Sequence, residues 1–306
     1  MGIQGGVRHT QRLAFATLAV WLMPALAETG LAQEGPPPIP VDVPLWMVGH
    51  GELDGSRLKP YSDVRFALGG AGKDGPLATG DRVEPAAFQV LSLTRERADD
   101  RDVWVRVAET YRAGEDEPVA RAEIVLDRHT LAPIRSLVEQ GGTATTLEYD
   151  WGDHRVRQTA PEAEDGSPTE VTLDLMSLEA GAHETWMAAL PFREGFRVMI
   201  PTLLGVGGGK WWAVPRVTGS ADIDLGDGTD REAWVVEMDW WGMGADHATF
   251  TPGGGINGTA GSGGKYWVLK EPLPGVPRVV RIRTEVSADR DRVLQIQDWP
   301  SGEASR

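Results

Sequence analysis

The chain has 306 residues, of which 41% are hydrophobic, and its 45 acidic and 30 basic side chains give a net charge of −15. This hydrophobic fraction argues against intrinsic disorder, and the negative charge argues against nucleic acid or an anionic membrane surface as a partner. Because the chain contains no cysteine, disulfides, cysteine metal ligands and a lipid-modified N-terminal cysteine are excluded.

Residues 1–32 have the features of a cleavable export signal. A basic start with Arg8 and Arg12 precedes the apolar run Leu13–Met23, and Ala25–Ala27 fits a small-residue cleavage site. A second cut after Ala32 also fits. The run is too short to span a bilayer, and no later run is long enough, so we expect no transmembrane span in the mature chain. The expected location is the periplasm, either free or associated with the outer membrane.

The rest of the chain is expected to hold one domain. The proline cluster in residues 33–44 (QEGPPPIPVDVP) predicts an extended linker without a core of its own. Residues 45–299 form the predicted β-rich domain, which includes a glycine-rich loop at 242–264, and residues 300–306 are a tail.

Hydrophobic residues alternate with polar ones along most of this domain, which is typical of strands. Turn signals recur every 8 to 12 residues or so and predict an antiparallel all-β architecture. The expected strands are Phe88–Arg97, Val103–Arg112, Val119–Leu126, Leu131–Glu139, Thr145–Trp151, His154–Thr159, Glu170–Leu175, Phe196–Ile200, Trp211–Ala221, Glu232–Trp241, Lys265–Lys270, Arg278–Val286 and Val293–Asp298.

One segment departs from this period. Residues 182–190 have Trp186, Ala189 and Leu190 near helical spacing from His183, and Pro191 follows them. They predict a single short helix in a β-protein.

His183-Glu184 resembles the first half of a zinc-hydrolase helix. That motif requires a second histidine four residues later, where this chain has Met187. Residues 205–212 (GVGGGKWW) fail the phosphate-loop pattern because Trp211 replaces the hydroxyl residue, and residues 222–230 (DIDLGDGTD) fail the calcium-loop register. The sequence therefore predicts no catalytic residue, metal site or cofactor.

Tryptophans cluster in the second half of the chain. Trp234, Val236, Met238 and Trp240 alternate along one face of a predicted strand, and such a face either packs as core or lines an apolar cavity. If an apolar ligand binds, the candidate residues are Trp211, Trp212, Trp234, Met238, Trp240 and Trp267. Trp241 lies on the face opposite Trp240, so burial of both would mean that the strand is covered on two sides.

Three segments resemble an exported bacterial family of unknown function: VLDRHTLAPIR (125–135), HETWMAALPFREGF (183–196) and KYWVLKEPLPGVPRVVRIR (265–283). The resemblance covers residues 85 to 290 or so. It implies the curved antiparallel half-barrel of the lipoprotein-localisation carriers, with residues 182–190 as a plugging helix and a turn formed by Asp127, Thr130 and Pro133. It implies no catalytic residue. This chain departs from the family by inserting Gly242–Gly264 before the Tyr-Trp-Val strand.

The predicted fold is thus a curved antiparallel sheet or half-open barrel with one short plugging helix. Three functions remain open. The first is a non-catalytic exported envelope protein that binds an apolar small molecule or lipid on its concave face, or contacts an envelope protein. The alternatives are a secreted metal-dependent hydrolase that uses His183 and Glu184, and a structural or interaction module with a filled core.

Overall fold

The computed structural model describes residues 43–72, 87–160, 168–173, 176–203, 210–243, 258–260, 264–287 and 290–298. The expected signal, the expected tail and most of the glycine-rich loop lie outside these residues. Of the expected linker, only Val43 and Pro44 are described, and Val43 is buried at 8% exposure.

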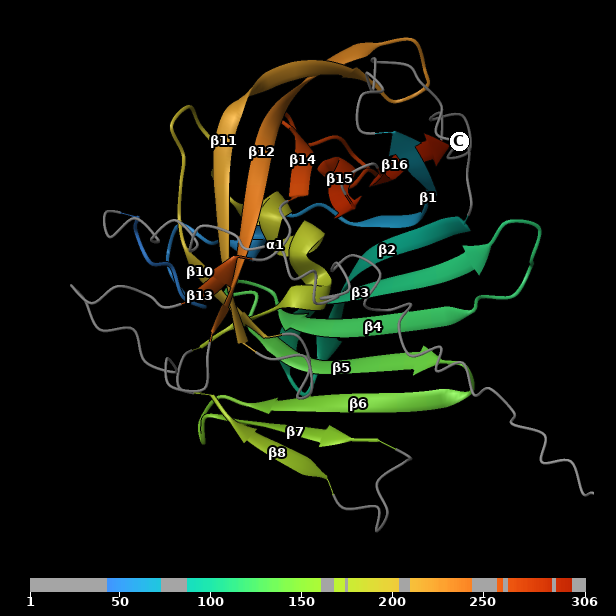
Figure 1. The fold of residues 1–306 in the computed structure, drawn as a ribbon. Helices are drawn as coiled ribbons and strands as arrows, with labels where there is room; N and C mark the ends of the chain where they lie inside the picture. Colours follow the sequence, from blue (N-terminus) through green and yellow to red (C-terminus); the bar gives the residue numbers. More distant parts are fainter. Residues whose placement is uncertain are drawn as a thin grey trace, which may run out of the picture.

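The described strands form one curved sheet that does not close on itself (Figure 1). Its strand order is β8-β7-β6-β5-β4-β3-β2-β1-β16-β15-β14-β12-β11-β10-β9, and β13 pairs with β12 outside this path. Neighbouring strands are antiparallel except β9 and β10, which are parallel. The predicted half-open all-β fold with one short helix is confirmed.

The first half of the chain forms a meander of hairpins in which each strand pairs with the next. Its elements are η1 Gly55–Arg57, β1 Tyr61–Gly72, β2 Ala87–Ala98, β3 Arg101–Arg112, β4 Ala120–Asp127, β5 Pro133–Gln140, β6 Thr143–Asp150, β7 Arg155–Thr159 and β8 Thr169–Thr172.

The second half contains the helix and returns the chain to β1. Its elements are β9 Leu178–Glu179, η2 Ala180–Ala182, α1 His183–Ala189, β10 Ile200–Leu203, β11 Lys210–Asp224, β12 Asp230–Met243, β13 Gly258–Ala260, β14 Gly264–Leu269, β15 Val279–Ser287 and β16 Arg290–Asp298. The last strand pairs with β1, so the two halves are joined along this seam.

The turn between β4 and β5 is built as its residues predict. Oδ1 of Asp127 accepts hydrogen bonds from the backbone N–H of His129, at 3.0 Å, and from both the N–H and the hydroxyl of Thr130, at 2.8 Å each. Leu131 has a φ of 58°, so it belongs to the turn, and β5 begins at Pro133 rather than at Leu131.

Two strand predictions need correction. The strand expected at Phe196–Ile200 instead begins at Ile200 and runs to Leu203. Pro215 on β11 accepts a hydrogen bond from the N–H of Val198 but has no N–H to donate in return. The regular pairing of β10 with β11 therefore does not extend to the residues before Ile200. β1 was not predicted, because Asp63 at φ 55° and a register shift between Tyr61 and Val64 break its alternation.

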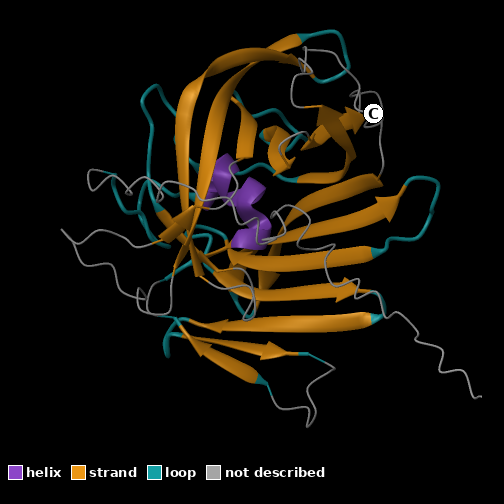
Figure 2. Ribbon diagram, viewed as in Figure 1, coloured by secondary structure: helices purple, strands orange, loops and turns teal. Residues whose placement is uncertain are grey.

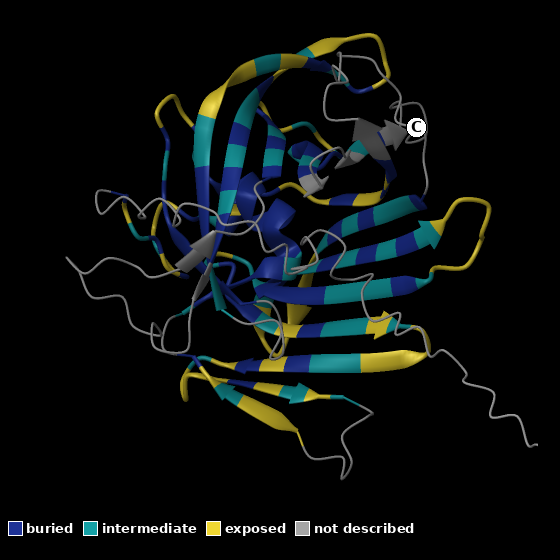
Figure 3. Cartoon of the chain, viewed as in Figure 1, coloured by how far each residue is buried: buried dark blue, intermediate teal, exposed yellow. Residues whose placement is uncertain are grey.

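The core lies between the concave side of the sheet and α1. Figure 2 shows the helix at the centre, surrounded by strands, and Figure 3 shows the buried positions concentrated around it. A second, smaller cluster lies on the opposite side of β11 and β12 and contains Val43, Met199, Trp212, Val214 and Trp241. β12 is therefore covered on both faces, since Trp240 and Trp241 are 6% and 8% exposed.

Candidate functional site

The candidate site is centred on α1, whose seven residues are all buried. The chain enters the helix through η2, where the Glu179 side chain accepts a bond from the N–H of Gly181. The indole N–H of Trp186 donates to the carbonyl of Glu179 at 3.2 Å and ties the helix back to β9. Trp186, Met187 and Ala189 are at most 1% exposed, which explains why so short a helix is stable here: packing holds it, because isolated helices of this length are not stable.

Glu184 forms a buried ion pair with Arg106 of β3. Nε and Nη2 of Arg106 each lie 2.6 Å from Oε1 of Glu184. The side chains are 2% and 3% exposed. Oε2 of Glu184 is buried and has no hydrogen-bond partner among the described residues. A pair this deep fixes the angular position of the helix inside the sheet, since displacing either group leaves an uncompensated charge.

His183 is buried beside this pair. Its Nδ1 lies 3.1 Å from the carbonyl of Ala180, so Nδ1 carries the proton and donates it. The ring meets Tyr266 and Trp240 edge to face, at centroid distances of 5.5 and 6.2 Å. Burial lowers the pKa of His183, so the imidazole is neutral at pH 7. Its Nε2 is a buried acceptor without a partner in the part of the chain that the structure describes. The ring therefore behaves as a packed core group.

The metal-hydrolase alternative requires His183 and Glu184 to lie near further metal ligands. Nδ1 of His183 and Oε2 of Glu184 are 3.7 Å apart. Among the described residues, however, no group of three or more His, Asp or Glu side chains is placed to hold a metal ion. The His-Glu pair thus has no further ligands in the part of the chain that the structure covers.

A second buried carboxyl lies at the start of the helix. The Tyr149 hydroxyl of β6 donates to Oε2 of Glu179, and both residues are buried. Burial raises the pKa of Glu179 to about 8, although the Gly181 N–H and the charge of Arg106 oppose the shift. Glu179 is therefore mostly protonated at pH 7, which lets it sit inside the sheet without a charged partner.

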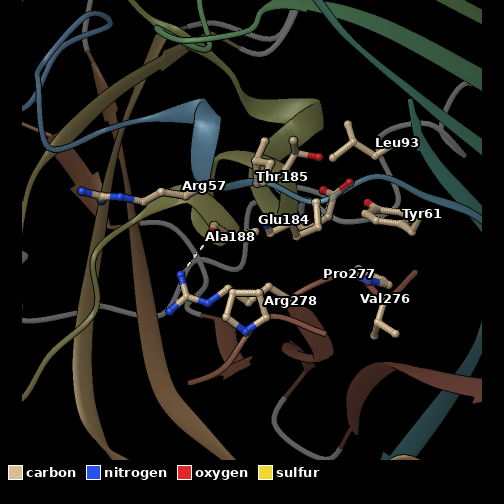
Figure 4. A pocket seen from close by; sticks show the side chains of 12 residues that line it. Arg57, Tyr61, Leu93, Glu184, Thr185, Ala188, Val276, Pro277 and Arg278 are labelled. Carbon is tan, nitrogen blue, oxygen red and sulfur yellow. Dashed lines mark hydrogen bonds between the residues drawn. The ribbon is translucent and has the colours of Figure 1, made fainter. Parts of the chain in front are cut away.

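A small pocket opens along one side of α1, between the helix, η1 and the turn before β15 (Figure 4). Its volume is about 20 Å³, room for one or two water molecules. In Figure 4 the side chains of Glu184 and Tyr61 extend toward one another, and Arg57 points away from them. The lining also includes Thr185 and Arg278. The pocket has room for water beside Glu184, but it cannot admit an acyl chain.

Two arginines close the helix end beside this pocket. Nη1 of Arg278 donates to the carbonyls of Ala188 and Leu190 at 2.9 and 3.0 Å. Nη1 of Arg57 donates to the carbonyl of Ala189 at 3.4 Å. Burial and the charge of Arg57 lower the pKa of Arg278 to about 10. The two guanidiniums therefore satisfy the last carbonyls of α1, which have no partner within the helix.

The six residues expected for an apolar ligand do not share one surface. Met238 and Trp240 are buried in the main core, and Trp211 and Trp234 pack against it half-buried. Trp212 belongs to the cluster on the other side of β11. Trp267 alternates with the buried Tyr266 and Val268, so it lies on the opposite face of β14, with its ring 5.4 Å from the Arg281 guanidinium. Trp267 nevertheless also packs against the main core, so five of the six contact that core and Trp212 belongs to the other cluster.

Comparisons with known proteins give no family for the chain. No family model and no curated protein match the sequence. One solved structure that aligns with the fold is a beta-barrel-like protein of the domain of unknown function DUF1849 from Brucella abortus. The alignment has a TM-score of 0.41 and 8% identity, and it covers 78% of this chain and 100% of the other. A functional assignment therefore rests on the geometry of this chain.

Sequence reasoning missed most of the partners of α1. Arg106 alternates with Trp104 and Ala108 along β3, and an arginine on an apolar strand face is a signal that it pairs with a buried carboxylate. Glu179, Tyr149 and Arg278 carry no such local signal, because their roles arise only from the long-range pairing of the sheet.

Proposed function

We propose that this chain is a non-catalytic protein of the bacterial cell envelope, exported by its N-terminal signal, and that it acts as a structural or interaction module with a filled interior. The composition of residues 1–32 supports the export part. The single observation that supports the rest is α1, which is buried at every residue and fixed to β3 by the Arg106–Glu184 pair. A half-barrel that carries an apolar ligand needs an open concave side, and here the helix fills it.

The outer surface of the sheet fits this proposal, because it is charged and accessible. Across β3, β4 and β5, the Arg121 guanidinium lies within 3.8 Å of Glu109, Glu123 and Glu139. Arg135 adds a contact of 3.0 Å to Glu123. Such a ladder keeps the sheet face hydrated, and it offers polar contacts to a partner rather than an apolar groove. Within the described residues, no helix is long and apolar enough to cross a bilayer.

Export is tested by N-terminal sequencing of the protein recovered from the cell envelope. We expect a mature start near residue 28 or 33. An intact Met1 on envelope material would contradict the proposal. A chain whose residues 13–23 carry two added arginines is the matched control, and it should remain in the cytoplasm with its signal uncut.

The filled interior is tested with N-phenyl-1-naphthylamine, a dye that fluoresces in apolar cavities, and with a fatty acid as competitor. We expect no stoichiometric dye binding to the native protein, and enhanced fluorescence only near the urea midpoint, where the core opens. A fatty-acid-binding protein serves as the positive control. Saturable native binding that the fatty acid displaces would favour the carrier hypothesis instead.

The hydrolase alternative is tested by metal analysis of the purified protein. Our proposal expects no stoichiometric zinc. Zinc bound one to one and lost on His183→Ala would overturn the non-catalytic assignment.

A further inference from the structure

We infer that a pocket on the outer side of the molecule, between residues 43–46 and the loop 193–198, binds a phosphate group carried by a compact organic molecule. We call it the Arg193–Arg197 pocket. Its lining consists of Val43, Pro44, Trp46, Gly195, Phe196 and Val198 together with the two arginines. This pocket lies apart from α1 and from the filled interior.

The walls of this pocket are held by backbone hydrogen bonds. The N–H of Trp46 donates to the carbonyl of Met199, and the N–H of Met199 donates to the carbonyl of Pro44, both at 2.9 Å. On the other side, the N–H of Val217 in β11 donates to the carbonyl of Phe196 at 2.9 Å. Figure 1 shows the N-terminal segment, in blue, running beside β10. Because both walls are anchored, the pocket is formed before any ligand arrives, which lowers the entropic cost of binding.

The loop itself is a tight turn that presents both arginines. The N–H of Phe196 donates to the carbonyl of Arg193 at 3.0 Å, and Gly195 takes a φ of 71°, a conformation that favours glycine. Arg193 and Arg197 therefore sit on either side of Gly195 and Phe196, and both contribute to the pocket lining.

Neither arginine has a carboxylate partner within the described part of the chain. The chain has fifteen more acidic than basic side chains, and most described arginines pair with a carboxylate, as Arg106 and Arg216 do. Nε of Arg197 is buried and has no hydrogen-bond partner in the described ranges. Arg197 as a whole is only half-buried and Arg193 is exposed, so an anion from outside the chain can reach the accessible N–H groups of both guanidiniums.

The charge and the size of the pocket indicate the ligand. Two guanidiniums match a phosphate monoester, which carries a charge of about −1.5 to −2 at pH 7, better than they match a single carboxylate. The volume is about 360 Å³, at the lower end of the range of about 300 to 1,000 Å³ that is usual for small-molecule sites. It therefore has room for a phosphate and a compact organic group.

The aromatic side chains supply a surface for that organic group. Trp46 and Phe196 meet edge to face at 5.5 Å, and Trp46 stacks on His50 at 4.5 Å. Both rings are fixed, at 6% and 4% exposure. A compact apolar group next to the phosphate can contact the small exposed part of each ring while the guanidiniums hold the oxyanion.

The test is isothermal titration of the purified protein with phenyl phosphate, which presents both features, and with phenol and inorganic phosphate, which present one each. We expect saturable 1:1 binding of phenyl phosphate, weaker binding of phosphate and none of phenol. Arg193→Gln and Arg197→Gln should each weaken binding by about tenfold or more, because each removes a charge-assisted contact. Added salt should also weaken it.

Arg101→Gln is the matched control, because Arg101 is exposed and forms no ion pair with a described residue; it should bind as the parent does. Circular dichroism melts should show that all three variants fold, since neither pocket arginine donates a side-chain hydrogen bond to a described residue. No binding of phenyl phosphate by the parent, or equal binding by the Arg193→Gln/Arg197→Gln double variant, would overturn the inference.

A vesicle experiment separates the two sources of such a phosphate. Sedimentation with phosphatidylglycerol vesicles that depends on both arginines would assign the phosphate to a lipid headgroup. Binding of phenyl phosphate without such sedimentation would assign it to a soluble phosphate ester. Either result supports the site, and neither bears on whether the interior is filled.

Discussion

Nε and Nη2 of Arg106 both contact a single oxygen of Glu184 at 2.6 Å, in a pair that is at most 3% exposed. The two residues join the middle of β3 to the first turn of α1, 78 positions later in the chain. This contact fixes the helix to the sheet.

Removing one partner of this pair should be far more damaging than removing both. We expect Arg106→Met or Glu184→Leu to lower the free energy of unfolding by about 3 to 5 kcal/mol, because each leaves a buried charge unpaired. The double variant should be more stable than either single variant. Urea unfolding measures all three, and additive losses in the double variant would contradict the prediction. Arg157→Ala is the control, since Arg157 and Glu170 are 52% and 43% exposed and the loss should stay within about 1 kcal/mol.

Glu179 should make stability fall as pH rises. Its pKa is about 8 in the folded state against an ordinary value of 4.5, so between these values the folded state keeps a proton that the unfolded state loses. The stability that this proton provides is complete below pH 4.5 and is lost as pH rises to about 8. We expect the parent to lose stability relative to Glu179→Gln by up to about 1.4 kcal/mol per pH unit within the window.

Urea unfolding of the parent and of Glu179→Gln at several pH values between these limits tests this point. The titration of His183 occurs in both proteins and cancels in the difference. Parallel stability curves for the two proteins would show that Glu179 does not hold its proton.

Trp240 should behave as a core residue. It is 6% exposed and lies with Val236 and Met238 in the main core, so Trp240→Ala should cost about 3 to 5 kcal/mol. Trp234→Ala should cost less, because Trp234 is half-buried at the margin under Lys270, whose Nζ is 4.4 Å from the ring centre. Urea midpoints give both values. A small loss for Trp240→Ala, together with a tryptophan-fluorescence response of the parent to fatty acid, would indicate a cavity at this face.

Gly55 should not tolerate a side chain. A Cβ there would lie 2.2 Å from the carbonyl oxygen of Arg128 and 2.7 Å from Cδ2 of Leu131. The carbonyl of Gly55 also accepts the indole N–H of Trp104 at 3.0 Å. We expect Gly55→Ala to lose about 1 to 3 kcal/mol by overpacking. At Gly51 a Cβ would meet nothing within 4 Å, so Gly51→Ala should change stability by less than about 0.5 kcal/mol. Equal melting temperatures for the two variants would contradict the close packing of Gly55 against the β4–β5 turn.

The sequence predicted those parts of the fold that depend on neighbours in the chain. The β2–β3 hairpin and the Asp127 turn are specified by alternation and by side chains that bond to their own turn. The helix at 183–189 follows from the break in that alternation and from Pro191. Trp211 and Trp212 are adjacent in a strand, and adjacency alone places them on opposite faces.

The remaining features depend on the register between distant strands. Nothing near Glu184 in the sequence indicates that Arg106 is its partner. A bulge also interrupts the alternation of polar and apolar residues by which a strand is recognised. In β1, Asp63 has a positive φ, and the register shifts beside it. The Arg193–Arg197 pocket was missed because one of its walls is the segment 43–46, which docks from the far end of the chain.

The pairing of β1 with β16 has a consequence for how the molecule is made. Arg65 is opposite Asp298, so this edge of β1 stays unpaired until a strand far along the chain folds onto it. During that interval β1 has a neighbour on one side and a row of unpaired peptide groups on the other, a template for association with other nascent chains. Such non-local pairing slows folding and extends the time that a chaperone must shield the edge. Yield in the cell should thus depend on how soon β16 pairs with β1.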